Sequence, residues 1–378
     1  MIGNLDYSTL QQIWWIIASL VGSLFLFLTF VQGGQTLLFT VPRDAEEKAL
    51  IINSLGRKWE LTFTTLVLFG GALFAAFPKF YATSFGGAYW VWMLILFTFI
   101  VQAVSYEYRK KPGNFLGATT YEAFLFINGS VGILLIGAAV GTFFTGSSFS
   151  LNDYNQVTWQ TPYRGLEAAR NFFNLSLGLF LVFNARVLGA MYLINNVEHA
   201  ALADRCRKSA WKSFLWSLPF LLYVVANLLF MKGYALNPAT GEIFLQNAKY
   251  LQNLLGNPVT LLLLLVGLIL VIYGVALTCF KNKNNGIWFS GIGTVLVGLA
   301  VFFLAGFNDT AFYPSSFDPQ SSLTIYNASS SHYTLTAMTY VALSVPFVLA
   351  YIAYVWKQMD SKKLSLAELS SEDAEEMY

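Results

Sequence analysis

"IWWIIASLVGSLFLFLTFVQGGQTLLF", residues 13–39, is the stretch of sequence from which the fold class follows. Its side chains are apolar or small, apart from Gln32 and Gln35 near its end. About 20 consecutive apolar residues are enough to cross a bilayer as a helix. The stretch therefore predicts a membrane-spanning helix, and it raises the question of why two glutamines lie inside it.

The composition of the whole chain also indicates a membrane protein. Of its 378 residues, 56% are hydrophobic, 17% aromatic and only 11% charged, whereas soluble domains are about 25% charged. So much apolar surface requires lipid as the solvent, and we expect an all-α integral membrane protein. The 22 basic and 20 acidic residues nearly cancel, so the net charge does not indicate a nucleic-acid partner.

Nine apolar runs are long enough to span a membrane, and we expect two four-helix bundles plus one peripheral helix. Because the first twelve residues lack Lys and Arg, the first run is expected to be a retained helix and not a cleaved signal. A Gly-rich hairpin at "KFYATSFGG", residues 79–87, is the simplest link between the second and third runs. The predicted spans are 13–39, 61–79, 86–106, 121–144, 171–194, 213–231, 259–280, 287–307 and 334–356.

Basic residues near the helix ends predict the orientation, because Lys and Arg concentrate in cytoplasmic loops. The odd-numbered connections and the C-terminal tail hold 16 of them, the even-numbered connections hold 5, and Arg186 lies within a span. This bias places the N-terminus outside and the C-terminus in the cytoplasm. Cys206 and Cys279 then both face the reducing side, which argues against structural disulfides.

The chain is expected to form one transmembrane domain, residues 1–356, followed by a polar cytoplasmic tail, residues 357–378, with a solvated and flexible acidic end. "EEKALIINSLGRKWE", residues 46–60, resembles "EHAALADRCRKSAWK", residues 198–212. Duplicated membrane folds leave such traces, although basic cytoplasmic loops also resemble one another. A pseudo-repeat of helices 1–4 in helices 5–8 is therefore one of two open readings.

Polar side chains from three consecutive helices are expected at one depth on the cytoplasmic side. They are Gln32, Gln35, Trp59, Glu60, Gln102 and Glu107. Intramembrane polar groups are functional candidates by default. In the structural alternative, the glutamines only join helices by hydrogen bonds, while the carboxylates reach the membrane surface as anchors.

Other polar residues have simpler interpretations. Arg186 is an unpaired charge in the fifth span, Glu122 is expected to cap the fourth, and Asn128, Asn174 and Asn184 are expected to join helices by hydrogen bonds. His199 and His332 lie outside the predicted spans, so the sequence does not support an intramembrane haem with a histidine ligand. No catalytic, metal-binding or nucleotide-binding motif is apparent.

Four segments resemble subunit II of the cytochrome bd-type quinol oxidases. They are "IWW" at 13–15, "INSLGRKWE" at 52–60, "GGALFAAFPKFYATSF" at 70–85 and "VSYEYR" at 104–109. The resemblance is strong over residues 8–115, and beyond them it rests on the number, order and length of the spans.

The resemblance implies a subunit of a bacterial inner-membrane terminal oxidase, which couples quinol oxidation to the reduction of dioxygen to water. It implies a larger partner, subunit I, that carries two b-type haems and one d-type haem. Subunit II of the family ligates no haem and contributes to proton delivery from the cytoplasm. A bound quinone and small accessory subunits are compatible with the resemblance, and neither is indicated by particular residues.

The sequence departs from the family pattern at the positions that matter for protons. The family has an acidic pair where this chain has Gln32 and Gln35, and an arginine where it has Gln102. Exchanging an acid and an arginine for amides removes a buried ion pair without leaving a charge unpaired. Gln35 and Gln102 are therefore expected to hydrogen-bond to each other or share a water.

Because an amide cannot titrate, Glu60 and Glu107 remain as the candidate proton-carrying groups, with Trp59 as a wall of the pathway. Carboxylates suit this task, since burial in a low-dielectric layer raises their pKa toward neutrality. A secondary transporter is the alternative function, and a structural membrane scaffold is a third.

Overall fold

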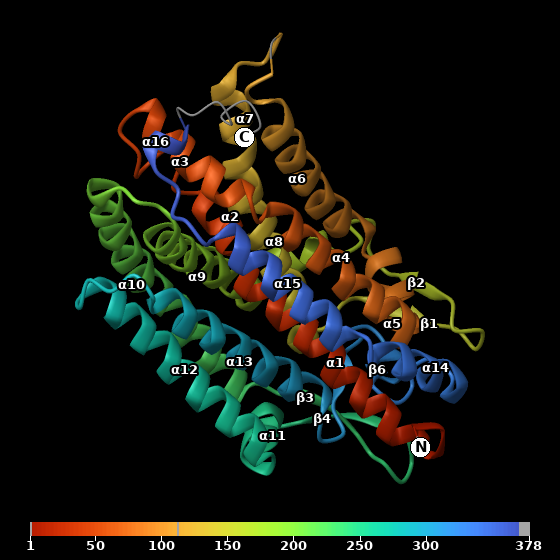
Figure 1. The fold of residues 1–378 in the computed structure, drawn as a ribbon. Coiled ribbons are helices and arrows are strands. Elements are labelled where there is room, and N and C mark those ends of the chain that lie inside the picture. Colours follow the sequence, from red (N-terminus) through yellow and green to blue (C-terminus); the bar gives the residue numbers. More distant parts are fainter. Residues whose placement is uncertain (1, 112, 370–378) are drawn as a thin grey trace.

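A computed structural model describes residues 2–111 and 113–369, and the described part contains nine helical spans (Figure 1). The fold class predicted from the sequence is confirmed. The acidic end of the predicted tail, residues 370–378, lies outside the described residues. The spans are Tyr7–Gln35, Ala45–Ala76, Tyr89–Tyr108, Ala118–Thr145, Phe172–Asn196, Ala200–Phe230, Pro258–Cys279, Gly286–Gly306 and His332–Met359.

Five of the spans are single helices, and four are divided. The single helices are α6 (Tyr89–Tyr108), α9 (Phe172–Asn196), α10 (Ala200–Phe230), α12 (Pro258–Cys279) and α13 (Gly286–Gly306). The divided spans are α1 (Tyr7–Leu28) with α2 (Phe30–Gln35), α3 (Ala45–Gly56) with α4 (Trp59–Ala76), α7 (Ala118–Ile127) with α8 (Ile133–Thr145), and α14 (His332–Ala342) with α15 (Val345–Met359). A π-helical turn, Asn128–Gly132, joins α7 to α8.

Short elements lie in the connections. The helices are α5 (Pro78–Tyr81), α11 (Lys249–Gly256) and α16 (Leu366–Leu369). The strands are β1 (Phe149–Leu151), β2 (Val157–Trp159), β3 (Gly233–Leu236), β4 (Ile243–Gln246), β5 (Ala311–Tyr313) and β6 (Leu323–Thr324), which pair as three antiparallel hairpins. All three hairpins lie at the end of the molecule that holds the N-terminus, away from α3 and α16 (Figure 1).

The basic connections differ from the sequence prediction, because they are helical. The carboxylate of Asp44 caps α3 by accepting a hydrogen bond from the backbone N–H of Glu47 at 2.8 Å, which favours a helix start. Likewise α10 begins at Ala200 and not at 213, with His199 as its cap. The expected Gly-rich hairpin is also wrong: Pro78 begins the one-turn helix α5, and a π-helical turn follows it.

Close packing joins the first span to the fifth. A Cβ at Gly33 would lie 1.7 Å from the backbone oxygen of Ala185, and one at Gly189 would lie 2.2 Å from the backbone nitrogen of Gly34. Small residues permit such close approach of helices in membranes. The α1–α2 span also packs against α4 and α13, so it is central to the molecule.

The last span lies on the outside of the helix bundle. None of the 15 residues of α15 is buried in this chain, and the helix crosses the face of the molecule formed by α1 and α4 (Figure 1). This agrees with the expected peripheral helix. In contrast, the α9 face toward α2 is fully covered, as Tyr192 stacks on Phe30 with ring centroids 4.1 Å apart.

Candidate functional site

Three glutamines form a buried amide layer between α2 and α6. Gln32, Gln35 and Gln102 have no exposed surface. The Nε2 of Gln32 donates a long hydrogen bond of 3.5 Å to Oε1 of Gln102, and Nε2 of Gln35 donates to the hydroxyl of Tyr106 at 3.2 Å. No direct bond joins Gln35 to Gln102, because Gln102 pairs with the other glutamine and Gln35 with a tyrosine that sequence reasoning missed. The alternative of a water shared by Gln35 and Gln102 stays a prediction.

The amide layer has unused hydrogen-bonding capacity. Oε1 of Gln32, Oε1 of Gln35 and Nε2 of Gln102 have no hydrogen-bond partner among the described residues. Nearby, Asn128 donates to Thr98 at 3.4 Å, and its Oδ1 is also without a partner. Most buried polar atoms in proteins are hydrogen-bonded to protein or ordered water. A polar layer with four such atoms is therefore suited to holding water.

Two aromatic rings lie beside the amide layer. The indole of Trp59, at the start of α4, stacks on the ring of Tyr106, near the end of α6, with centroids 5.6 Å apart and an interplanar angle of 11°. Both rings are buried. This stack joins the start of α4 to the end of α6.

The two carboxylates next to this stack point away from the core. Glu60 follows Trp59, Glu107 follows Tyr106, and both side chains are exposed. Neither forms an ion pair with any residue in the described part of the chain. In this chain alone, Glu60 and Glu107 thus lack the burial that the proton-pathway argument assumed.

A carboxylate that the sequence placed in a cap is instead the centre of a buried ion-pair network. Glu122 lies inside α7, whose cap is Gly117. Its Oε1 accepts two hydrogen bonds from Arg109, at 2.8 and 3.1 Å, and its Oε2 lies 2.9 Å from Nζ of Lys48. Only 4% of the Glu122 side chain is exposed. The network joins α3, the end of α6 and α7.

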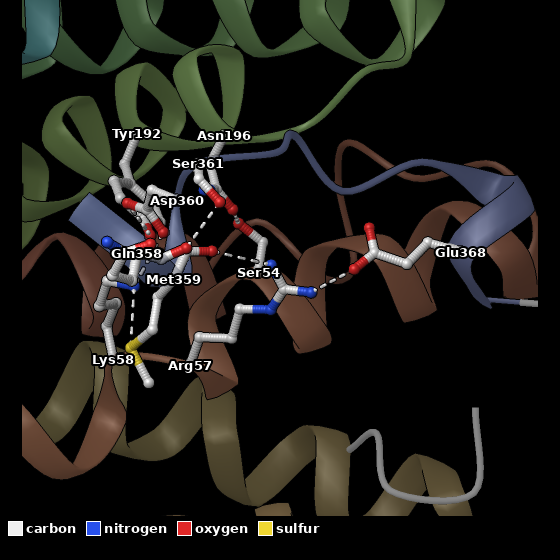
Figure 2. Close-up of polar contacts among 10 residues, drawn as sticks. All are labelled: Ser54, Arg57, Lys58, Tyr192, Asn196, Gln358, Met359, Asp360, Ser361 and Glu368. Atoms are coloured by element: carbon white, nitrogen blue, oxygen red, sulfur yellow. Dashed lines mark hydrogen bonds and ion pairs between the residues drawn. The ribbon is translucent and has the colours of Figure 1, made fainter. Parts of the chain in front are cut away.

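The first part of the C-terminal tail packs against the α3–α4 junction, as Figure 2 shows. Asp360 forms an ion pair with the buried ammonium of Lys58 at 2.9 Å and accepts a hydrogen bond from Tyr192 at 3.4 Å. Glu368 pairs with Arg57 at 2.8 Å. Two backbone hydrogen bonds attach Leu364 to the segment that joins α9 to α10. The tail thus covers the junction of α3 and α4, next to Trp59.

A cavity of about 170 Å³ lies between the exposed side of Glu60 and the last span. Its walls include Lys58, Glu60, Tyr351 and Trp356. The ammonium of Lys58 lies 5.3 Å from the ring centroid of Trp356, a distance typical of a cation–π contact. Glu60 therefore borders a partly enclosed space and not only open lipid.

The remaining polar candidates form hydrogen bonds between helices or line cavities. The guanidinium of Arg186 donates to the carbonyl and hydroxyl of Thr36 at 2.6 and 2.9 Å and to the hydroxyl of Thr40 at 2.7 Å. Asn174 joins α8 to α9 through the hydroxyl of Thr145 at 2.9 Å. Asn184 lines an apolar cavity between α9 and α13.

The histidines form hydrogen bonds within the chain, and the cysteines are unpaired. Nδ1 of His199 accepts a hydrogen bond from the backbone of Leu202, and Nε2 of His332 lies 2.9 Å from the carbonyl oxygen of Leu5. His332 is the first residue of α14 and begins the last span, whereas the sequence prediction had placed it outside that span. Residues 2–111 and 113–369 contain no group of three or more His, Cys, Asp or Glu that could hold a metal. Cys206 and Cys279 are both free thiols.

Comparisons with known proteins agree over nearly the whole chain. The sequence is 29% identical over 373 residues to cytochrome bd-I ubiquinol oxidase subunit 2 of Escherichia coli, covering 94% of this chain and 95% of that protein. It is 25% identical over 369 residues to cytochrome bd ubiquinol oxidase subunit 2 of Bacillus subtilis, covering 94% and 98%.

The fold has a counterpart among solved structures. A chain of the bd oxidase from Geobacillus thermodenitrificans matches with a TM-score of 0.62 and 13% identity, over 94% of this chain and all of that one. The family described as "Cytochrome bd terminal oxidase subunit II" matches residues 10–359. The nine spans, their order and this match lead to one conclusion: the chain belongs to the cytochrome bd terminal oxidase subunit II family.

Proposed function

We propose that this chain is the haem-free subunit of a quinol oxidase, and that Glu60 and Glu107 form the entrance of a proton pathway into subunit I. Ubiquinol is the substrate named for the E. coli and B. subtilis relatives. The complex couples its oxidation to the reduction of dioxygen in the respiratory chain. The family resemblance assigns two b-type haems and one d-type haem to subunit I, and this chain is proposed to ligate none of them.

The observation that carries the proposal is the shared position of the two carboxylates. The Trp59–Tyr106 stack brings α4 and α6 together at one depth, and each ring is followed in sequence by an exposed glutamate. A carboxylate on the lipid-facing side of a span is costly, and covering by a second protein removes that exposure. The exposed faces of α4 and α6 therefore form the surface on which subunit I is expected to pack.

Protons must cross a low-dielectric layer to reach buried haems. A carboxylate enclosed at the subunit interface can accept a proton from the cytoplasmic side and release it inward. The amide layer cannot titrate, but its four unpaired polar atoms can order water behind the Trp59–Tyr106 stack. Gln32, Gln35 and Gln102 thus support a hydrated layer while Glu60 and Glu107 carry the charge.

The 16-to-5 distribution of basic residues supports an orientation with this entrance on the cytoplasmic side of the bacterial inner membrane. In that orientation the N-terminus and the three hairpins lie outside, and the docked tail lies in the cytoplasm. The family match does not support the secondary transporter that the sequence left open.

The decisive experiment replaces each carboxylate with its amide, since Glu60→Gln and Glu107→Gln keep size and polarity. Oxygen consumption with ubiquinol and proton uptake are measured on the purified two-subunit complex after its haem content is verified by absorption spectra. Removing a general acid–base group reduces a rate by roughly 10²- to 10⁴-fold when no other group replaces it. Because two carboxylates share the entrance, the single variants are expected to lose at least tenfold in turnover, and the double variant more.

Glu198→Gln is the matched control, because Glu198 is an exposed glutamate at the same end of the molecule and outside the spans. It should retain full turnover. If both Glu60→Gln and Glu107→Gln assemble with full haem content and keep the proton uptake of the control, the carboxylates are membrane-surface anchors and the pathway proposal fails.

A further inference from the structure

A basic pocket lies between α2, α7, α9 and α10, away from the Glu60–Glu107 face. Its volume is about 600 Å³. Four basic side chains line it, and its lining contains no aspartate or glutamate. These cations are Arg186, Arg205, Lys208 and Lys212.

One of the four cations is neutralised and three are not. Arg205 is paired with Glu47 and donates to the carbonyl of Val41 at 2.8 Å. Arg186 bonds only to neutral oxygens of Thr36 and Thr40. Lys208 and Lys212 are exposed and form no ion pair with the described part of the chain. The pocket therefore presents three positive charges without a counter-charge.

Two of the three charges, Arg186 and Lys212, lie at one level along the helices, and Lys208 lies one turn nearer the connection between α9 and α10. Arg186 is ten residues before the end of α9, and Lys212 is twelve residues after the start of the antiparallel α10. At about 1.5 Å per residue, both lie roughly 15–18 Å from the connection between the helices. One turn further along α10, Trp216 is 64% exposed, and tryptophan is enriched where headgroups meet acyl chains.

We propose that this basic pocket binds the phosphodiester headgroup of an anionic phospholipid. The Arg186 guanidinium and the two ammonium groups contact the phosphate oxygens, and the apolar walls around Phe183 and Trp216 receive the start of the acyl chains. Basic pockets between spans on the cytoplasmic side suit such headgroups. A lipid is favoured over free phosphate because apolar side chains share the lining with the cations.

The test uses the detergent-purified complex with subunit I and measures lipid retention by native mass spectrometry. Phosphatidylglycerol and phosphatidylcholine with identical acyl chains are compared. Each basic residue near an anionic lipid contributes about fivefold in affinity, so Lys208→Gln/Lys212→Gln should weaken phosphatidylglycerol binding roughly 30-fold. Phosphatidylcholine binding should not change.

Lys281→Gln/Lys283→Gln is the matched control, because it removes two exposed lysines from the same end of the molecule but outside the pocket. It should retain phosphatidylglycerol as the unmodified complex does. Equal loss in both double variants, or no loss in either, would overturn the assignment. Displacement of phosphatidylglycerol by millimolar inorganic phosphate would show a free-anion site and overturn the lipid assignment as well.

Discussion

Gly33→Ala tests the contact between the first and fifth spans, on which the fold depends. A Cβ at Gly33 would lie 1.7 Å from the oxygen and 2.0 Å from the carbon of the Ala185 carbonyl group, whereas ordinary contact begins at 3.4 Å. Because both obstacles are backbone atoms, no side-chain rotation relieves the overlap. To lengthen this Cβ–oxygen distance from 1.7 Å to an ordinary 3.4 Å, the two helices must separate by about 1.7 Å.

This separation has a calculable cost. Overpacking a core typically costs about 1–3 kcal/mol. Moving α2 away from α9 also breaks the hydrogen bonds of Arg186 to Thr36 at 2.6 and 2.9 Å, and a hydrogen bond to a charged group contributes about 1.5–3 kcal/mol. The higher helix propensity of alanine offsets about 1 kcal/mol. We expect a net destabilisation of about 3 kcal/mol or more.

The measurement is the temperature at which the purified complex loses half of its activity, together with its yield from the membrane. Gly256→Ala is the control, because Gly256 lies in α11, away from the proposed surface for subunit I, and a Cβ there would meet its nearest neighbour, Nδ2 of Asn308, at an ordinary 3.8 Å. Its complex should be as stable as the unmodified one or slightly more so. Equal half-inactivation temperatures and yields for the two variants would refute the close-packing argument.

Three further outcomes are expected. Asp360→Asn leaves the ammonium of Lys58, whose side chain is 2% exposed, without its ion-pair partner. This loss should lower the stability of the complex by about 3 kcal/mol, measured by thermal inactivation. The control Asp204→Asn changes a carboxylate that is 69% exposed and should cost less than about 1 kcal/mol. Glu122→Gln leaves Arg109 and Lys48 unpaired and should lower the half-inactivation temperature more than Glu46→Gln, which changes an exposed residue; equal effects would contradict a stabilising network. Tyr333→Cys, at a position 81% exposed, should react with an impermeant thiol reagent only from outside the cell, and labelling from the cytoplasmic side alone would reverse the orientation.

Hydropathy predicted the existence of every span, because lipid as a solvent demands long apolar helices with internally satisfied backbones. It did not predict the helical basic connections. The segment that becomes α3 and the first turns of α10 are mixed in polarity, and they are helical because caps and packing against other spans stabilise them. Hydropathy detects segments that contact lipid, so it does not predict helices that lie at the membrane surface.

The arrangement of the candidate site was likewise predicted only in part. Spacing along the helices placed Gln32, Gln35 and Gln102 at one depth, and the structure gathers them in one buried layer. Which amide pairs with which depends on the rotation of α6 relative to α2, and no local sequence pattern encodes that rotation. The stacking of Trp59 on Tyr106 and the outward direction of Glu60 and Glu107 depend on the same rotation.

By itself, the sequence determined that the chain is a nine-span membrane protein and which family it resembles. Each of these follows from composition, from the order of residues, or from motifs of a few adjacent residues. The tertiary structure alone decided the partners of residues far apart in the chain: Glu122 with Lys48 and Arg109, and Asp360 with Lys58. Ion pairs and hydrogen bonds form only within about 4 Å, and the helix packing that brings such groups together is a property of the whole fold.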